Sequence, residues 1–241
     1  MTCKYAEICG LEGTHSGGDA VYCILHLPNP RKSSREFLLA FETKADAANF
    51  SHYYFPLECS DALVGRTFSK TLVLIDAHYQ QDRINLKGVV LNSGCEIACD
   101  SISDVILQNA VVAGALMLRF KEVKGILAID GTTFRDSVDI QADRVAGISG
   151  TGIETLFMDR TVIKCQNINQ LNLNECRLRN TQLSLGTLTN LYLRSVNFAD
   201  ECIIKANYIE SISLESANIE GNLSINVGRS NGVSFDGARL T

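Results

Sequence analysis

Residues 163–203 read IKCQNINQLNLNECRLRNTQLSLGTLTNLYLRSVNFADECI. Every fifth residue of this stretch is large and apolar: Ile163, Ile168, Leu173, Leu178, Leu183, Leu188, Leu193, Phe198 and Ile203. An α-helix repeats its buried face about every 3.6 residues and a strand about every 2 residues, so neither explains a period of five. A chain that turns a corner after each short strand, and buries one large side chain per side, does explain it.

A longer period runs through residues 66–241. Pairs of apolar residues flanking a single residue recur there, and corresponding pairs lie 20–22 residues apart. Five residues per side and 20–22 per turn give four sides, and fixed periods of this length are typical of stacked repeats. We therefore predict an all-β fold, a quadrilateral parallel β-helix of about eight turns stacked about 4.8 Å apart. The pairs are Leu72/Leu74, Ile84/Leu86, Cys95/Ile97, Val105/Leu107, Leu116/Leu118, Leu127/Ile129, Val138/Ile140, Leu171/Leu173, Leu191/Leu193, Ile212/Leu214 and Val233/Phe235.

The corners and irregularities of this coil are also predictable. Small residues are expected two positions before each large one, as at Cys176, Thr181 and Gly186. Asparagine tolerates unusual backbone angles and can bond between turns, so we place Asn167, Asn169, Asn172, Asn174 and Asn180 at corners. Single-residue slips predict bulged corners at 203–209 and 219–225. The glycines of residues 146–155 break the pattern and predict a local bulge or kink.

Several of these segments resemble a known family. Cys176-Arg-Leu-Arg-Asn180, Ala217-Asn-Ile-Glu-Gly221 and Ala238-Arg-Leu240 look like the five-residue unit of pentapeptide-repeat proteins. The resemblance is clear over residues 160–241 and degenerate over 66–160. It departs at Leu171, Leu191 and Ile212, where a large residue replaces the family's small one. The resemblance implies a right-handed quadrilateral β-helix without catalytic residues, and some bacterial members also begin with a Cys/His module and a short helix.

The N-terminal segment, 1–30, holds a candidate metal site. Cys3, Cys9, Cys23 and His26 form the pattern C-x5-C-x13-C-x2-H. Three thiolates and one imidazole fill a tetrahedral zinc site and leave no open position, so we predict a structural zinc ion. The segment is Gly-rich (Gly10, Gly13, Gly17 and Gly18) and too short for a core of its own, so it needs such a cross-link. His15 is a spare candidate ligand, and unrelated free cysteines are the alternative.

A helix is expected to connect this module to the coil. Pro28 and Pro30 end the module, and Ser33 with Glu36 reads as a capping box for a helix over about 33–50. Its apolar stripe is expected to cover the open edge of the first turn, with the aromatic residues of 52–56 packed beneath it. The predicted organisation is thus a module at 1–30, a helix and linker at 31–58, and the coil at 59–241. The stripe consists of Phe37, Leu38, Phe41, Ala45 and Ala48.

Composition narrows the class of protein. The chain of 241 residues has a net charge of −5, and residues 60–241 hold 20 acidic and 17 basic residues. This near balance disfavours a surface that binds nucleic acid directly. No apolar run is long enough to cross a membrane, and the N-terminus lacks the apolar core of a signal peptide. We therefore expect a soluble, cytoplasmic protein whose nine cysteines are reduced or bind metal.

These observations predict a non-catalytic scaffold for an unknown protein partner. One alternative is a DNA-mimicking topoisomerase inhibitor, which needs a continuous negative stripe. Another is a polysaccharide-acting β-helix enzyme, which needs acidic residues such as Asp130, Asp136, Asp139 and Asp143 to converge. Cys95 and Cys99 are expected to be core residues rather than ligands. The last turn stops in mid-motif at Arg239-Leu240-Thr241, which predicts end-to-end self-association or a longer chain.

Overall fold

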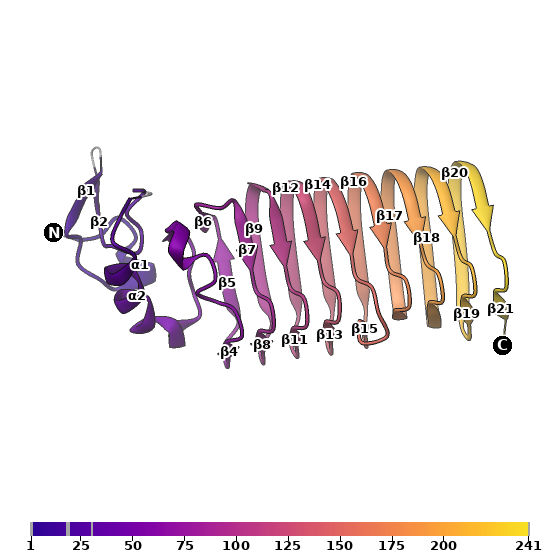
Figure 1. Ribbon diagram of the computed structural model, residues 1–241, viewed down its shortest axis with the longest axis horizontal. Coiled ribbons are helices and arrows are strands. Elements are labelled where there is room, and N and C mark those ends of the chain that lie inside the picture. Colours follow the sequence, from indigo (N-terminus) through magenta and orange to yellow (C-terminus); the bar gives the residue numbers. More distant parts are fainter. Residues whose placement is uncertain (1, 18–19, 30, 241) are drawn as a thin grey trace.

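The protein is a rod of stacked coils with a small head at its N-terminal end (Figure 1). The computed structural model describes residues 2–17, 20–29 and 31–240. Of the residues used above, Gly18, Pro30 and Thr241 lie outside these ranges. The predicted all-β coil is confirmed as a parallel β-solenoid of about 9 turns, one more than expected.

Each coil has four sides, and its strands pair in parallel with the coils before and after it. In the first coils each side is a separate strand, as in β4 (Thr67–Phe68), β5 (Leu72–Ile75) and β7 (Arg83–Asn85). Later strands run around the corners and cover several sides. The remaining strands of the rod are β8 (Val90–Leu91), β9 (Cys95–Ile102), β10 (Asp104–Ile106), β11 (Val111–Val112), β12 (Leu116–Ala128), β13 (Thr133–Phe134), β14 (Val138–Ser149), β15 (Leu156–Phe157), β16 (Thr161–Asn172), β17 (Arg177–Tyr192), β18 (Asn197–Ser213), β19 (Asn218–Ile219), β20 (Asn222–Ser234) and β21 (Arg239–Leu240).

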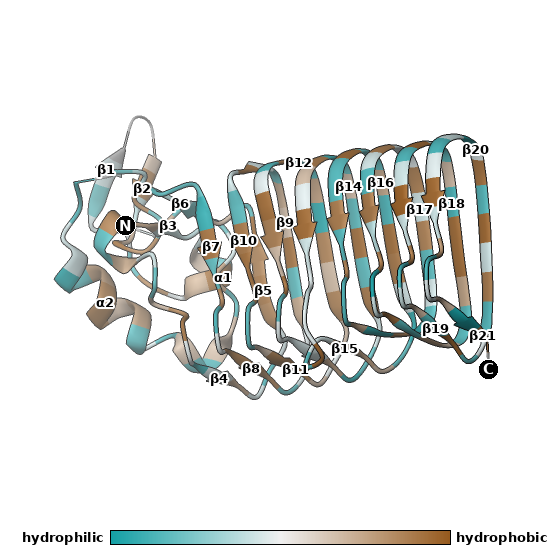
Figure 2. Ribbon diagram, turned by 45° about the vertical axis from the view of Figure 1, so that its right-hand side comes forward, coloured by the Kyte–Doolittle hydropathy of each residue, from teal (hydrophilic) through white to brown (hydrophobic). Residues whose placement is uncertain are grey.

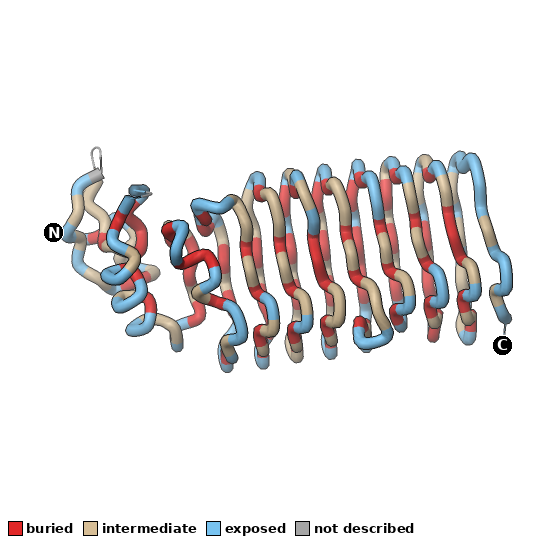
Figure 3. The backbone as a smooth tube through the Cα atoms, viewed as in Figure 1, coloured by how far each residue is buried: buried red, intermediate tan, exposed pale blue. Residues whose placement is uncertain are grey.

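The register explains the long sequence period. Val138 pairs with Thr161, and Thr161 with Thr181, so residues one period apart in the sequence lie side by side in adjacent coils. The apolar pairs predicted to point inward are buried through Ile212/Leu214. Buried segments recur at the same level in successive coils (Figure 3), and hydrophobic segments line up along the rod in the same way (Figure 2). In the last coil that the structure describes, Val233 and Phe235 are 46% and 51% exposed, because no described coil stacks on them.

The period of five is correct for eight of its nine positions. Ile163 through Phe198 are buried at every fifth residue, but Ile203 is half-buried and pairs with Gln182. Its neighbour Ile204 pairs with Leu183 and points inward. The predicted slip at 203–209 is therefore wrong, because the extra residue lies one side earlier in the coil, before Ile204. The extra residue lies at the corner after Ala199, where Asp200 has a φ of 65°. Two adjacent isoleucines made the inward one ambiguous. The slip at 219–225 is confirmed, since Ile225 stacks on Ile204.

One corner of the rod is a column of left-handed residues. Most of these corner residues donate their amide to a backbone carbonyl of the next coil. For example, Ser195 N donates to Glu215 O at 2.9 Å, and Glu215 directly precedes Ser216, the corner residue of that coil. Glycine suits this backbone, and small polar residues tolerate it. Asn174 confirms the predicted role of asparagine, because its Oδ1 accepts from Arg194 N in the next coil at 2.7 Å. The column contains Gly88, Asn109, Gly131, Gly152, Glu175, Ser195, Ser216 and Gly237.

The predicted bulge at residues 146–155 is present at this same corner. Ser149 is the counterpart of Ala128 and Leu156 the counterpart of Thr133, so this corner is two residues longer than the one before. The extra length pushes Ile153 outward until it is 78% exposed. Gly150 occupies an inward position, where an added Cβ would lie 2.9 Å from Ile129 Cγ1.

The connecting helix is shorter than predicted. Helix α2 spans Ser34–Glu42, a 3-10 turn follows at Ala45–Ala47, and Ala48 then adopts a φ of 56°. The chain leaves the helix because residues 49–55 extend the ladder of the rod backward: Phe50 N donates to Val73 O, and β3 (Tyr54–Phe55) pairs in parallel with β6 (His78–Tyr79). The open edge of the first coil is therefore covered by a partial coil as well as by the helix.

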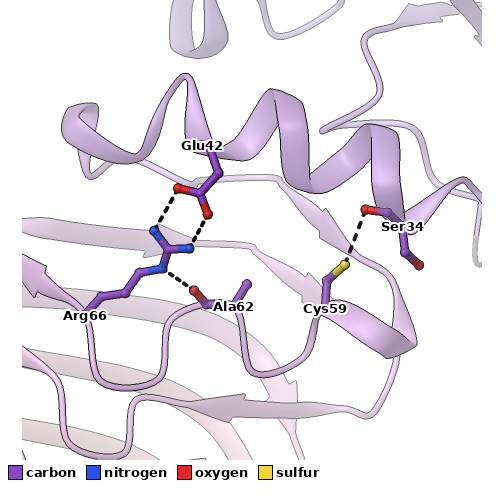
Figure 4. A network of polar contacts seen from close by, with 5 residues as sticks. All are labelled: Ser34, Glu42, Cys59, Ala62 and Arg66. Atoms are coloured by element: carbon purple, nitrogen blue, oxygen red, sulfur yellow. Dashed lines mark hydrogen bonds and ion pairs between the residues drawn. The ribbon is translucent and has the colours of Figure 1, made fainter.

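Helix α2 is held on the first coil by aromatic and polar contacts. Phe37 and Phe41 are fully buried, and the Phe41 ring lies 4.8 Å from that of Phe50. At the end of the helix, Glu42 accepts from both terminal nitrogens of Arg66, whose Nε donates to Ala62 O (Figure 4). These contacts fix the helix against the corner that precedes β4.

The predicted N-cap is confirmed, since Ser33 Oγ accepts from Glu36 N at 3.2 Å. We expect Ser33→Ala to lower the free energy of unfolding by about 1 kcal/mol, because one amide of the first turn loses its partner. Urea denaturation would measure this. Ser69→Ala changes an exposed serine outside the helix and serves as control; an equal loss in both variants would contradict the cap.

Candidate metal centre

The head consists of a short helix and a hairpin that bring four ligands together. Helix α1 (Ala6–Cys9) ends at Gly10, whose φ of 60° turns the chain back. An antiparallel hairpin, β1 (His15–Gly17) and β2 (Ala20–Tyr22), then leads directly into Cys23. Cys9 therefore comes from the end of the helix, and Cys23 and His26 come from the turn after the hairpin.

Cys3, Cys9, Cys23 and His26 form one cluster, as the sequence predicts. All four are buried, and their ligand atoms lie within 4.8 Å of one another. Cys23 Sγ is 3.7 Å from Cys9 Sγ and 3.2 Å from His26 Nδ1, and Cys3 Sγ is 3.6 Å from the same nitrogen. Tetrahedral zinc with ordinary bond lengths places two sulfurs about 3.8 Å apart and sulfur and nitrogen about 3.6 Å apart. The cluster therefore has the size to hold a metal ion.

Backbone groups already support the sulfurs. Cys23 N donates to Cys3 Sγ at 3.2 Å, and Leu11 N donates to Cys9 Sγ at 3.5 Å. At Cys9 this bond favours the thiolate and so opposes the effect of burial on the pKa of the thiol. Both bonds orient the two sulfurs toward the centre of the cluster.

Burial sets the protonation of the cluster. Burial raises the pKa of the Cys23 thiol to about 12 and that of Cys9 above its usual value, while it lowers the pKa of His26 to about 4. The imidazole is therefore neutral at pH 7 and can offer a lone pair. The thiols need a cation to become thiolates, and a divalent metal supplies that charge.

The head is attached to the rod through the ligand histidine. The His26 ring meets the Tyr53 ring edge-on at 4.8 Å, and Tyr5 stacks on His52 at 4.7 Å. Tyr54 N, in the partial coil, donates to Leu25 O at 2.8 Å. The metal cluster and the first coil therefore share one packed interface.

Lys32 is a residue of this interface that the sequence analysis missed. It is only 6% exposed, and its Nζ donates to Ile24 O at 2.7 Å and to Leu25 O at 3.1 Å. The ammonium also lies over the rings of Phe37 and Tyr54. Burial lowers the pKa of Lys32 to about 7, and the Cys23 and Cys59 side chains oppose this shift. The sequence does contain a signal for this role, because Lys32 lies between the C-x2-H turn and the N-cap of the helix.

We expect Lys32→Met to destabilise the head by about 1–3 kcal/mol, because two buried carbonyls of the ligand turn lose their donor. Hydrogen exchange at the amides of residues 20–29 would report the change. Lys70→Met removes an exposed lysine from the rod and should leave this exchange unaltered. Unchanged exchange in Lys32→Met would show that the ammonium does not support the turn.

The other candidate ligands lie outside the cluster. His15 is on strand β1 and Cys95 is fully buried in the rod, and neither belongs to the one candidate metal group found in the described ranges. Cys99 is half-buried on strand β9. The prediction that Cys95 is a core residue is therefore confirmed, whereas Cys99 is only partly in the core.

The four aspartates considered for catalysis contact different partners. Asp130 accepts from Ser149 and Thr151, and these bonds with that from Gln108 outweigh burial and hold its pKa below the usual value. Asp136 accepts from Ser137 N, and Asp139 accepts from Gln141. Asp100 has the largest effect in raising the pKa of Lys121 on strand β12, and Asp143, on strand β14, lies close enough for its charge to add to that effect. Their hydrogen bonds do not join them into one group.

Comparisons with protein-family models, with curated proteins and with solved structures found no match to this chain. The likeness to pentapeptide-repeat proteins therefore depends on the segments quoted above. Within the described ranges, no helix has the length and apolar character needed to cross a membrane. The observed features are thus a parallel β-solenoid and a buried Cys3His cluster that can bind a metal.

Proposed function

We propose that the protein is a non-catalytic scaffold of the pentapeptide-repeat type, in which a structural zinc ion stabilises the head. The observation that carries the proposal is the closed cluster of Cys3, Cys9, Cys23 and His26, buried at the base of a continuous rod. Four protein ligands fill tetrahedral coordination, so the ion has no position for a substrate. Its contribution is then to folding.

Zinc is the metal that this ligand set favours, because thiolates and imidazole in tetrahedral arrangement are its usual structural ligands. Elemental analysis of freshly purified, reduced protein should find about one zinc per chain. Cys9→Ser should lower this content, whereas Cys99→Ser should not. Absence of metal, or a different metal at full occupancy, would defeat the assignment.

The rod supports the scaffold role through its rigidity. One core of buried residues runs from Cys3 to Ile219, and neighbouring coils are joined along its whole length by strand pairing. Such a structure presents fixed side surfaces along its axis. A protein partner that binds one of these surfaces would be held at a fixed distance from the head.

The charge pattern of the rod disfavours mimicry of DNA. Several acidic side chains form ion pairs with a basic residue of a neighbouring coil, as in Arg144–Glu122, Arg179–Asp200 and Arg194–Glu215. A protein that mimics DNA needs a continuously negative surface along the rod. These ion pairs place positive charges beside the negative ones and so interrupt such a surface. The scaffold is therefore the function that we propose.

Affinity capture with photo-crosslinkers at defined rod positions tests the scaffold. A stoichiometric protein that crosslinks to one side surface, and is lost when charges on that surface are reversed, would support it. The scaffold proposal would be overturned if charge reversal on each of the side surfaces in turn left the capture unchanged. Turnover of a substrate by the purified chain would also overturn it.

Self-association through the C-terminal coil is a separate prediction, which rests on the apolar residues exposed there. Val233, Phe235 and Leu240 are 46%, 51% and 83% exposed on that coil. Strand pairing between two such coils would bury them. Sedimentation of the full chain should show dimers that Phe235→Asp abolishes; a monomer at all concentrations would contradict this contact.

A further inference from the structure

A long groove runs along the rod. It has a volume of about 1090 Å³ and is lined by equivalent residues of successive coils, from Ile75 to Asn226. Strand pairing connects one wall as a single column: Arg119, Gln141, Lys164, Ser184, Lys205 and Asn226 are neighbours in that order. At about 4.8 Å per coil, the groove is roughly 34 Å long. Its shape suits a linear ligand that lies along the rod axis.

The side chains of this wall alternate in charge. Arg119, Lys164 and Lys205 are cationic. The residues that follow each of them in the column, Gln141, Ser184 and Asn226, are neutral and polar. Cations therefore recur on every second coil, about 10 Å apart. A linear ligand whose negative charges are also about 10 Å apart could place one charge beside each of these cations.

Toward the C-terminus, the opposite wall also alternates from coil to coil. Gln166 and Asn207 lie two residues after Lys164 and Lys205, and the intervening coil has Gly186 at this position. Gly186 has no room for a side chain, because an added Cβ would lie 2.2 Å from Gln166 O. The floor between the walls is largely apolar, with Cys165 and Leu185 4% and 6% exposed. Each two-coil unit thus offers a lysine, an amide and an apolar floor.

The two halves of the groove differ in charge. Toward the N-terminus, Arg119 pairs with Glu96 and Lys121 with Asp100, so cations there are neutralised. Asp143 is the last acidic residue of the lining toward the C-terminus. From Lys164 onward the lining contains no acidic residue, and neither Lys164 nor Lys205 forms an ion pair with any residue that the structure describes. This half has two uncompensated positive charges.

From this pattern we propose that the groove binds a linear acidic polysaccharide with one carboxylate on every second sugar. A sugar ring is about as long as the spacing between coils, so each coil meets one ring. Lysines then pair with the carboxylates, while Gln166, Asn207 and Ser184 bond to hydroxyls. This site is independent of the scaffold role and of the metal.

Other linear polyanions fit less well. An extended peptide repeats its side chains on one face about every 6.7 Å, which matches neither one coil nor two. Single-stranded nucleic acid is held by stacking on exposed aromatic rings, and the one aromatic residue of the groove, Phe120, is 7% exposed. Both are included as probes below.

The test is calorimetric titration of the full chain with an octasaccharide of alternating glucuronate and N-acetylglucosamine. We expect saturable binding, which Lys164→Gln with Lys205→Gln weakens about tenfold, since two exposed charge pairs are lost. Ser184→Glu, which places a negative charge between the two lysines, should weaken binding similarly. The matched control, Lys70→Gln with Lys87→Gln, makes the same change in net charge at exposed sites outside the groove and should stay within about twofold.

Three results would overturn the proposal. The first is an octasaccharide that shows no saturable binding, or that binds equally well to the groove and control variants. The second is a neutral malto-octaose of equal length that binds as tightly, which would remove the role of the carboxylates. The third is tighter binding of an oligoglutamate peptide or of a single-stranded oligonucleotide, which would assign the groove to that class of ligand instead. All variants replace exposed or half-buried side chains, and circular dichroism would verify their fold.

Discussion

Replacing Cys23 with serine, or removing the metal with a chelator, should unfold the head while the middle of the rod stays folded. Structural zinc contributes about 10–16 kcal/mol to folding in small modules at pH 7. Among the large apolar side chains described before Pro28, only Leu25 is fully buried. Without the cation, the head lacks the contacts to offset the entropy of ordering. Hydrogen exchange should therefore rise across residues 2–29.

Acid should have the same effect as the chelator. The metal binds thiolates, and burial raises the pKa of Cys9 and Cys23, so protons compete with the ion for the sulfurs. Metal affinity must therefore fall as the pH falls, and binding must release protons. A zinc-indicator titration at several pH values would measure both.

A matched control separates the metal site from cysteine chemistry in general. Cys99→Ser alters a half-buried cysteine of the rod that lies outside the cluster, and should keep both the metal and the protection of the head. Repeated coils respond to damage mainly through their neighbours, so strands from β9 onward should keep their protection in Cys23→Ser. A Cys23→Ser protein that retains one metal ion and an ordered head would refute the assignment of this ligand.

Gly186→Ala should destabilise the rod strongly for a change of a single methyl group, with a loss of about 3 kcal/mol of unfolding free energy. An alanine Cβ would lie 2.2 Å from Gln166 O and 3.0 Å from Gln166 C in the adjacent coil. The residues on either side of Gln166, Cys165 and Asn167, are paired with the adjacent coil, so this backbone carbonyl cannot move aside as a side chain can. The coils must separate locally, which strains the hydrogen bonds on both sides.

Gly232→Ala is the control for this prediction. Gly232 also lies in a long strand, β20, but an added Cβ there would meet nothing within 4 Å. Since neither glycine has a positive φ, alanine is compatible with the backbone at both positions. Urea denaturation should show a loss for Gly186→Ala and little change for Gly232→Ala. Equal stabilities would mean that the coils are not in backbone contact at this corner.

The inward-facing residues and the metal ligands could be predicted because their patterns are local. A buried side chain on each side imposes its period of five directly on the sequence, and this works wherever one residue alone is apolar, as at Leu173 or Leu188. The C-x2-H pair and the two earlier cysteines are likewise close together in the chain, between Cys3 and His26. The pattern failed at Ile203, where two adjacent isoleucines satisfy it equally well.

The amino-acid pattern is therefore sufficient to establish that the chain coils, which side chains fill the coil and which four residues can hold a metal. The end of helix α2 depends on tertiary contacts, because residues 49–55 leave the helix to pair with Val73 and with strand β6, far along the chain. Tertiary contacts also make Lys32 a support of the ligand turn and bring Lys164 and Lys205 to one wall of a groove. These relations join residues of different coils or elements, and the register of a coil is fixed only when it stacks on its neighbour.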